Sequence, residues 1–320
     1  MKTYVLITGG FGYLGGRIAT ELASKPGLAI RLGSRKIQLP PTWLPQAEVA
    51  AMNILDPASL MSAMQGVRVV VHLAAMNENE CLADPNKATL INTLGTLNVL
   101  QAAIDAGVKR FIYFSTAHIY GAPLVGHITE KTLPRPTHPY AITHRAAEDF
   151  VLAAHDQKKI TGIVVRLSNG FGVPTHPNID RWTLLVNELC RQVVQTKKMV
   201  LRSSGLQQRD FISLKDVGRA VGHLLTLSSS ECGIGLFNLG GKRSLSVWEM
   251  VQKIAQRCQA IFGFLPTIER VEVNSNEQVR ALNYDCEILL KTGYTLEGNI
   301  EEEIDNTLFF CKQIWGADVL

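Results

Sequence analysis

The stretch TYVLITGGFGYLGG (residues 3–16) runs from an unbroken series of mostly apolar residues into a loop rich in glycine. Residues 3–8 are typical of a strand buried on both faces, and the apolar spacing over residues 17–25 predicts a helix. Between them, Gly9, Gly12 and Gly15 follow the spacing G-x-x-G-x-x-G. Such a loop turns tightly and lets the N–H groups at a helix start approach a pyrophosphate. Because strand, loop and helix occur together, a dinucleotide site is favoured over a plain tight turn.

Strands and helices continue to alternate as far as residue 168. Apolar runs predict strands over residues 28–34, 47–54, 67–75, 108–116 and 160–168, and periodic segments predict helices over 56–66, 87–107 and 140–156. Helix 56–66 has clear boundaries, because Asp56 suits the N-cap, Pro57 the first turn and Gly66 the stop. Continuous apolar strands that alternate with helices are typical of a parallel sheet covered on both faces. We therefore expect an α/β fold with a Rossmann-type, doubly wound sheet.

After residue 168 the pattern loosens, because prolines and glycines divide the chain into shorter pieces. This change predicts a dinucleotide-binding domain over residues 1–168 and a smaller C-terminal substrate lobe over residues 169–209 and 240–320. Residues 210–239 include the stretch FISLKDVGRAVGHLLTL and are expected to pack back on the first domain.

The composition excludes several classes of protein. The 320 residues carry a net charge of only +4 and no block of Lys and Arg, which argues against nucleic-acid binding. No apolar run is long enough to cross a bilayer, and the N-terminus enters a strand without the features of a signal peptide, so a cytoplasmic protein is expected. Six scattered cysteines without a C-x-x-C pair predict buried thiols, with no zinc or other metal site.

The end of the second strand predicts which dinucleotide binds. An acidic residue at that point would accept a hydrogen bond from the ribose 2′-hydroxyl of NAD. Here Gly33 takes the acidic position and is followed by Ser34, Arg35 and Lys36, with Arg17 nearby in the first helix. A hydroxyl and cations suit a 2′-phosphate, so NADP(H) is preferred, and NAD(H) remains the alternative.

Seven motifs occur along nearly the whole chain in an order that resembles a known family: TGGFGYLGG, HLAA, FSTAHIYG, PYAITHRAAED, RLSNGFG, RDFISLKDV and FNLGG. The chain is similar to the extended short-chain dehydrogenases/reductases of the nucleotide-sugar epimerase and dehydratase type. The resemblance implies hydride transfer on a nucleotide-activated sugar, and a homodimer formed through two helices of each subunit.

Individual roles follow only from that resemblance. Thr116 corresponds to the catalytic Ser/Thr, Tyr140 to the catalytic tyrosine and Asn92 to a structural asparagine. Asn169, Arg209 and, with weaker motif support, Arg280 fall where the family contacts its substrate, while His118 is either a substrate contact or an ordinary loop residue. Together, the glycine loop, the end of the second strand and the resemblance give the following cofactor-binding candidates: Gly9, Gly12, Tyr13, Leu14, Gly15, Ser34, Arg35, Lys36, Asn53, Ile54, Leu73, Ala74, Ala75, Tyr140 and His144.

One residue departs from the family pattern. His144 stands where the family has a lysine four residues after the catalytic tyrosine. A lysine would supply a permanent cation, whereas an imidazole with a pKa near 6.5 is mostly neutral at pH 7.5. Three hypotheses follow: an enzyme with an altered proton relay, an enzyme in which Tyr140 acts mainly as a general acid, or a protein that keeps the dinucleotide without catalysis. The neighbouring Glu148 and Asp149 are predicted to form a solvated helix face.

The net reaction is predicted to be ketoreduction or epimerisation, with reduction favoured because the second strand lacks the NAD signature of the epimerases. Dehydration is disfavoured, since Ala117 and His118 replace the acidic pair that dehydratases carry after the threonine. The alternative from a different class is a non-catalytic NADP(H)-binding regulatory or scaffold protein.

Overall fold

A seven-stranded parallel sheet forms the centre of the computed structural model, which describes residues 2–274 and 277–316. Its strand order is β11-β7-β5-β4-β1-β2-β3, and every neighbouring pair is parallel. The strands are β1 (Thr3–Thr8), β2 (Leu28–Ser34), β3 (Glu48–Ala51), β4 (Val67–His72), β5 (Arg110–Thr116), β7 (Thr161–Leu167) and β11 (Leu236–Leu239). The order runs outward in both directions from β1, as in a doubly wound sheet, so the predicted fold class is confirmed.

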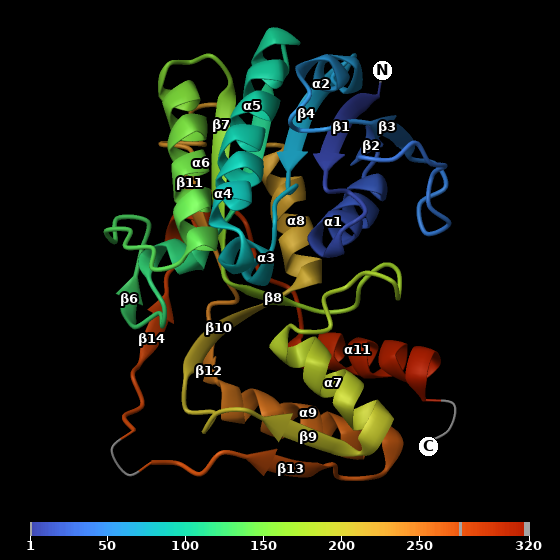
Figure 1. Ribbon diagram of the computed structural model, residues 1–320, viewed down its shortest axis with the longest axis vertical. Coiled ribbons are helices and arrows are strands. Elements are labelled where there is room, and N and C mark those ends of the chain that lie inside the picture. The colour runs from blue at the N-terminus through green and yellow to red at the C-terminus, as the bar shows by residue number, and fades with distance from the viewer. Residues whose placement is uncertain (1, 275–276, 317–320) are drawn as a thin grey trace.

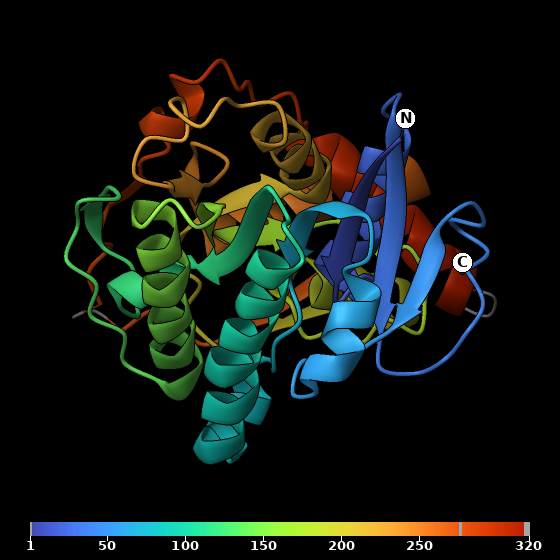
Figure 2. The same cartoon turned by 90° about the horizontal axis from the view of Figure 1, so that it is seen from above.

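Helices cover both faces of this sheet (Figure 1, Figure 2). One face carries α2 (Pro57–Ala63), α5 (Gly95–Asp105) and α6 (Pro139–Asp156), and the other carries α1 (Tyr13–Ala23) and α8 (Leu214–Leu224). The packing of strand β1 explains why its apolar residues do not alternate with polar ones. Leu6 packs in the cluster beneath α2, α5 and α6, whereas Val5 and Ile7 pack in the cluster beneath α1 and α8. Burial on both sides therefore requires apolar residues at consecutive positions.

Two of the predicted helices differ in how closely they match the sequence pattern. Helix α2 has the expected caps, because the Asp56 carboxylate accepts a hydrogen bond from the N–H of Ala58 and Gly66 adopts a φ of +71°. The predicted helix 87–107 is instead divided into α4 (Pro85–Ala88), a π-helical segment η1 (Thr89–Leu94) and α5. The wider turn of η1 contains Asn92, whose side chain is fully buried.

The remaining elements lie mostly below the sheet in Figure 1. Strands β9 (Lys198–Leu201) and β13 (Thr267–Arg270) pair, as do β6 (Gly126–Ile128) and β14 (Leu282–Tyr284), and β10 (Gln208–Ser213) lies between β8 (Asn169–Phe171) and β12 (Ser244–Ser246). Helices α7 (Leu185–Thr196), α9 (Val247–Phe262) and α11 (Ile300–Trp315) enclose a separate apolar cluster. Short elements complete the chain: α3 (Glu78–Ala83), the 3₁₀ turn η2 (Ala117–Tyr120) and α10 (Glu287–Leu290).

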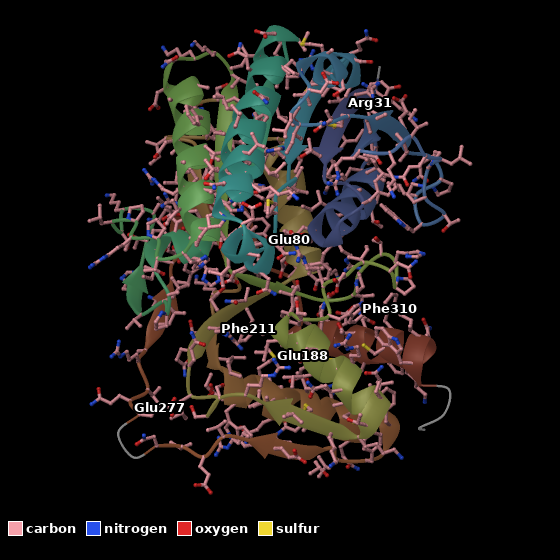
Figure 3. The ribbon with its side chains drawn as sticks, in the orientation of Figure 1. Arg31, Glu80, Glu188, Phe211, Glu277 and Phe310 are labelled. Atoms are coloured by element: carbon pink, nitrogen blue, oxygen red, sulfur yellow. The ribbon has the colours of Figure 1, made fainter. Side chains whose placement is uncertain are left out.

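The boundary between these elements and the sheet is where side chains from both converge. Helix α3, which carries Glu80, lies at the lower end of the sheet in Figure 3, and Phe211 of β10 lies below it. Helix α8 packs against α1, and β11 pairs with β7, so parts of residues 210–239 join the sheet and its helices. The carboxyl ends of β1, β4 and β5 point toward this boundary, which is where parallel sheets bind ligands.

All six cysteines are buried and free, as the scattered spacing predicts. None of the helices formed by residues 2–274 and 277–316 combines the length and the apolar character that crossing a bilayer requires.

Candidate active site

The glycine loop between β1 and α1 forms a tight backbone cradle. Gly9 has a φ of +66°, and the N–H of Gly12 donates to the carbonyl of Gly9 at 2.9 Å. Gly15 packs so closely beneath this turn that a Cβ would lie 2.2 Å from the Gly9 oxygen, so no larger residue fits there. Helix α1 starts at Tyr13 and has no side-chain cap, which leaves its first N–H groups for an anion. The loop therefore fits the pyrophosphate of a dinucleotide.

The side chains that flank this cradle hold it in place. The Tyr13 hydroxyl donates to the carbonyl of Gly172 at 2.8 Å, and Leu14 packs against the sheet core. The N–H groups of Leu73 and Ala74 donate to Thr8 Oγ1 at 3.1 and 3.2 Å, whereas Ala75 is exposed. The predicted cofactor contacts of Tyr13, Leu73 and Ala74 therefore fall on a rigid framework at the ends of β1 and β4.

The cofactor-selecting residues lie at the end of β2. A Cβ at Gly33 would lie 2.5 Å from the sulfur of Met52, so a side chain at this position would require Met52 to move. Ser34 Oγ donates to the Lys36 carbonyl at 2.8 Å and shapes the turn, while Arg35 and Lys36 are exposed. Arg17 is directed elsewhere, because it forms an ion pair with Glu303 of α11 at 3.5 Å.

The adenine-side candidates form a polar turn after β3. Asn53 Oδ1 accepts from the N–H of Leu55 at 3.1 Å, and its backbone N–H donates to Ser59 at 3.0 Å. Ile54 packs against Gly95, and its carbonyl accepts from Asn98 at 3.0 Å. The exposed Asn53 thus presents a fixed amide at the end of the strand.

Tyr140 and His144 lie in the first turns of α6, and their rings meet edge to face with centroids 4.4 Å apart. Burial raises the pKa of Tyr140 to about 12; the charge of Arg181 opposes this rise in pKa, while Cys81 and Glu78 add to it. Burial lowers the pKa of His144 to about 3. The site therefore contains a protonated phenol beside a neutral imidazole.

Thr116 ends β5 beside the same helix. Its Oγ1 accepts from the N–H of His118 at 3.2 Å, and among the described residues its own hydrogen has no acceptor. The His138 ring stacks on Tyr140 at 6.1 Å and meets the ring of His118 at 5.7 Å. His118 is mostly buried, and burial lowers its pKa. The Thr116 hydroxyl is thus free to donate to a ligand in a site lined by imidazoles.

The predicted substrate residues are distributed along the lower side of the site. Asn169 donates to the carbonyl of Asp210 at 2.9 Å, and the half-buried Arg209, whose pKa is lowered by burial and raised by Glu78, lies next in the chain. Arg280 is exposed. A cavity of about 490 Å³ is lined by sequence neighbours of the two arginines and by further residues: Gln208, Lys242, Ser244, Val279, Ala281, Leu282, Asn283 and Tyr284.

Two charged residues near Tyr140 were missed by the sequence analysis. Arg181 follows β8 in a loop, and Glu78 begins α3; both act on the pKa of Tyr140. Glu78 Oε1 also lies 3.5 Å from His138 Nε2. Neither residue belongs to a recognisable motif, so the sequence contained no signal for them.

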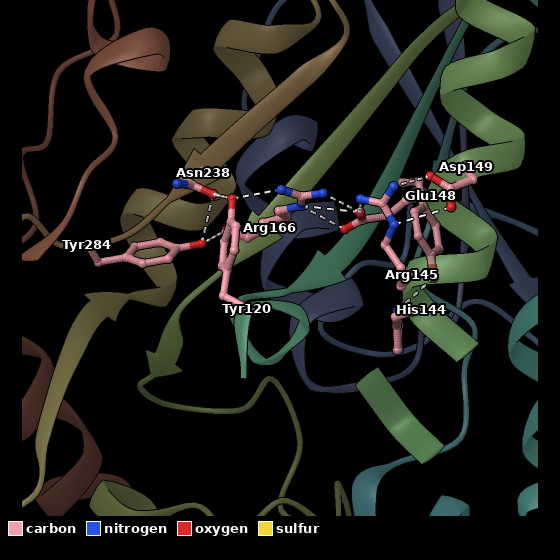
Figure 4. Close-up of polar contacts among 9 residues, drawn as sticks. Tyr120, His144, Arg145, Glu148, Asp149, Arg166, Asn238 and Tyr284 are labelled. Carbon is pink, nitrogen blue, oxygen red and sulfur yellow. Dashed lines mark hydrogen bonds and ion pairs between the residues drawn. The ribbon is translucent and has the colours of Figure 1, made fainter. Parts of the chain in front are cut away.

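One sequence prediction is wrong. Glu148 is completely buried and accepts three hydrogen bonds from Arg166 of β7, at 2.7, 3.0 and 3.2 Å (Figure 4). Only Asp149 is solvated, where it pairs with Arg145 at 2.6 Å. The reason is that Glu148 faces the sheet, where the guanidinium of Arg166 compensates its charge.

The sequence pattern of the NAD dependent epimerase/dehydratase family matches residues 5–240. The dTDP-D-glucose 4,6-dehydratase of Mus musculus is 27% identical over 272 residues, 79% of this chain and 72% of that protein. The GDP-6-deoxy-D-mannose reductase of Pseudomonas aeruginosa is 28% identical over 239 residues, 71% of this chain and 76% of that protein. The solved structure of RMD from Pseudomonas aeruginosa complexed with NADPH has a TM-score of 0.79 at 24% identity, covering 98% of this chain and 99% of that chain.

Proposed function

We propose, from the premise that this chain belongs to the NAD dependent epimerase/dehydratase family, that it reduces the keto group of a nucleotide-activated sugar with NADPH. Similarity to the dehydratase and the reductase supports a nucleotide-sugar substrate. The direction of the reaction is inferred from the charges at the site.

The observation that carries the proposal is the pairing of Tyr140 with His144. Reduction of a ketone needs a proton donor at the oxygen, and a phenol with a pKa of about 12 holds its proton at neutral pH. The start of oxidation needs the opposite, a phenolate, which a lysine cation would stabilise. His144 is neutral and offers no such charge. The arrangement therefore favours Tyr140 as a general acid.

The remaining residues receive roles that fit this chemistry. A bound nicotinamide dinucleotide supplies the hydride. The Thr116 hydroxyl donates a hydrogen bond to the substrate oxygen, and the Tyr140 hydroxyl gives its proton to the same oxygen as the carbonyl becomes an alcohol. Arg209 follows Gln208, and Arg280 lies between Val279 and Ala281, three residues that line the 490 Å³ cavity; both arginines suit the diphosphate of the substrate. Asn169 contributes amide hydrogen bonding on the same side.

The test is an assay of purified protein with NADPH and a panel of keto-sugar nucleotides, in which the absorbance of the reduced nicotinamide measures turnover. Oxidation of NADPH that depends on one sugar nucleotide is the expected result. Calorimetry with NADPH alone separates the alternatives. Binding without turnover on any keto-sugar would favour the non-catalytic regulator, and no dinucleotide binding at all would overturn the proposal.

The preference for NADPH is expected to depend on Arg35. Substitution Arg35→Glu should weaken NADPH binding relative to NADH by about 10–100-fold, because a hydrogen bond to a charged group contributes roughly 1.5–3 kcal/mol. Calorimetric titration with both dinucleotides measures the ratio. Arg68→Glu is the matched control, since Arg68 is also exposed but lies at the start of β4, far along the sheet from the cradle. Equal effects of the two variants would argue against a 2′-phosphate site at residues 34–36.

A homodimer in the cytoplasm is part of the same proposal. Apolar side chains are exposed where η1 and α6 pack together: Leu90 and Leu94 at 43%, Ile142 at 51% and Phe150 at 41%. Light scattering is expected to give twice the mass of one chain, and Ile142→Asp is expected to give the monomer. The control is Ile234→Asp at a more exposed apolar residue outside this face. A monomeric wild type would contradict the dimer.

A further inference from the structure

The imidazole of His144 uses only one of its two ring nitrogens. Its Nδ1 lies 2.7 Å from the hydroxyl of Tyr113 on β5. Its Nε2 is buried and has no hydrogen-bond partner among the described residues. His144 itself is 3% exposed on the sheet side of α6 (Figure 4). Buried polar atoms are rarely left unpaired in folded proteins, so this nitrogen needs an explanation.

A neighbouring chain of hydrogen bonds shows how protons are distributed in this part of the core. The Thr96 hydroxyl donates its only hydrogen to the carbonyl of Asn92 at 2.6 Å. His72 Nε2 lies 3.0 Å from the same Thr96 oxygen and must therefore be the donor there. His72 Nδ1 is then an acceptor, and it receives the hydroxyl hydrogen of Thr8 at 2.7 Å. His72 is thus fixed as the neutral tautomer that carries its hydrogen on Nε2.

The hydrogens shared by Tyr113 and His144 can be assigned in the same way. Burial holds the pKa of the Tyr113 hydroxyl well above its ordinary value, so the phenol keeps its single hydrogen. The hydrogen of the nearby Thr96 goes to Asn92, and the hydrogen bond that the described residues offer the Tyr113 hydroxyl is the one to His144 Nδ1. The 2.7 Å contact with Nδ1 is therefore the place for the phenol hydrogen. With Nδ1 as acceptor, the neutral imidazole carries its own hydrogen on Nε2.

We propose that Tyr113 is a positioning residue that locks His144 in its Nε2–H tautomer and so keeps one N–H donor ready beside Tyr140. The inference rests on the proposed function, in which that donor replaces the lysine contact to the nicotinamide-side ribose. A lysine ammonium is a donor in every orientation, whereas an imidazole is a donor or an acceptor according to its tautomer. The phenol of Tyr113 removes this ambiguity. The unpaired Nε2 is then a site kept for the ligand.

The tautomer can be measured in the protein without ligand by long-range ¹H–¹⁵N correlation of the histidine side chains. Wild-type His144 is expected to show the Nε2–H pattern, with His72 as an internal reference of the same tautomer. Tyr113→Phe removes only the hydroxyl and is expected to give His144 the averaged shifts of both tautomers, while His72 is unchanged. An Nδ1–H pattern for His144 in the wild type would overturn the proposal, as would an unchanged pattern in Tyr113→Phe.

A second readout links the tautomer to the dinucleotide. Tyr113→Phe is expected to weaken NADPH binding by about threefold to tenfold in calorimetry, the range for one hydrogen bond, and to raise KM for NADPH more than it lowers kcat. Tyr294→Phe is the control, because it removes another buried tyrosine hydroxyl, one that donates only to the carbonyl of Asp216. An equal loss in both variants, or unchanged affinity in Tyr113→Phe, would refute the positioning role.

The two readouts also separate this inference from the proposed function. If the wild type binds no dinucleotide, the proposed function is wrong. The role given to the Nε2–H group of His144 is then wrong as well, whichever tautomer is observed. If NADPH binds and His144 is the other tautomer, only the role of Tyr113 fails. Should Tyr113→Phe not fold, the wild-type spectrum still decides the tautomer, and Tyr113→Met offers a second variant without the hydroxyl.

Discussion

The Tyr140→Phe variant is expected to turn over keto-sugar nucleotides about 10²–10⁴-fold more slowly than the wild type, the range that a positioned general acid contributes. The substitution removes one hydroxyl and keeps the ring that packs against His138 and His144. Tyr140 holds its proton because its surroundings raise its pKa to about 12, so the hydroxyl is a donor over the whole neutral range. The loss should therefore appear in kcat, measured at saturating NADPH.

Dinucleotide affinity is the control for this variant. The NADPH affinity from calorimetry and the urea midpoint of unfolding are expected to remain close to those of the wild type, because the Tyr140 hydroxyl forms no hydrogen bond with the residues that the structure describes. If Tyr140→Phe lost its affinity for NADPH, the slow turnover would have a structural cause. Turnover equal to that of the wild type, with the cofactor still bound, would exclude Tyr140 as the acid and favour the non-catalytic alternative.

Six of the seven strands of the sheet were predictable because each contains an apolar run of its own. Residues 28–34 form one strand with the expected bounds, since an apolar run between turn residues is sufficient to define it. Strand β11 (Leu236–Leu239) was not predicted as a strand, because it lies after residue 168, where prolines and glycines interrupt the alternation of strands and helices. The π-helical turn around Asn92 was also missed, since one inserted residue leaves the apolar spacing of the segment nearly unchanged.

The site was predictable only where a motif marks it. Thr116 and Tyr140 follow from local motifs, and the structure places both at one edge of the sheet. Glu78 and Arg181 act on Tyr140 from a short helix and a loop that tertiary structure alone brings there. The burial of Glu148 depends on its pairing with Arg166, which lies 18 positions away on another element. Helix periodicity alone assigns a glutamate to the solvated face and therefore gave the wrong prediction for Glu148. Pairing between distant charges is decided by the fold.

That pairing leads to the largest expected effect on stability. Arg166→Met is expected to lower the free energy of unfolding by about 3–5 kcal/mol, because it leaves an uncompensated carboxylate in the core. Glu148 and Arg166 are 0% and 1% exposed. Arg166 Nη1 also donates to the Tyr120 hydroxyl at 2.7 Å, which donates to Asn238 at 2.8 Å (Figure 4). The network joins α6, β7, β11 and η2 beneath the helix that carries Tyr140.

Urea unfolding of three variants tests whether the charge or the packing matters. Arg145→Met is the matched control, since Arg145 also approaches Glu148, at 3.6 Å, but is one-third exposed and is expected to change stability by less than about 1 kcal/mol. The double variant Glu148→Leu with Arg166→Met removes both charges and is expected to recover most of the loss. If the double variant were as unstable as Arg166→Met alone, the hydrogen bonds to Tyr120 would be the cause, and the buried carboxylate would not be.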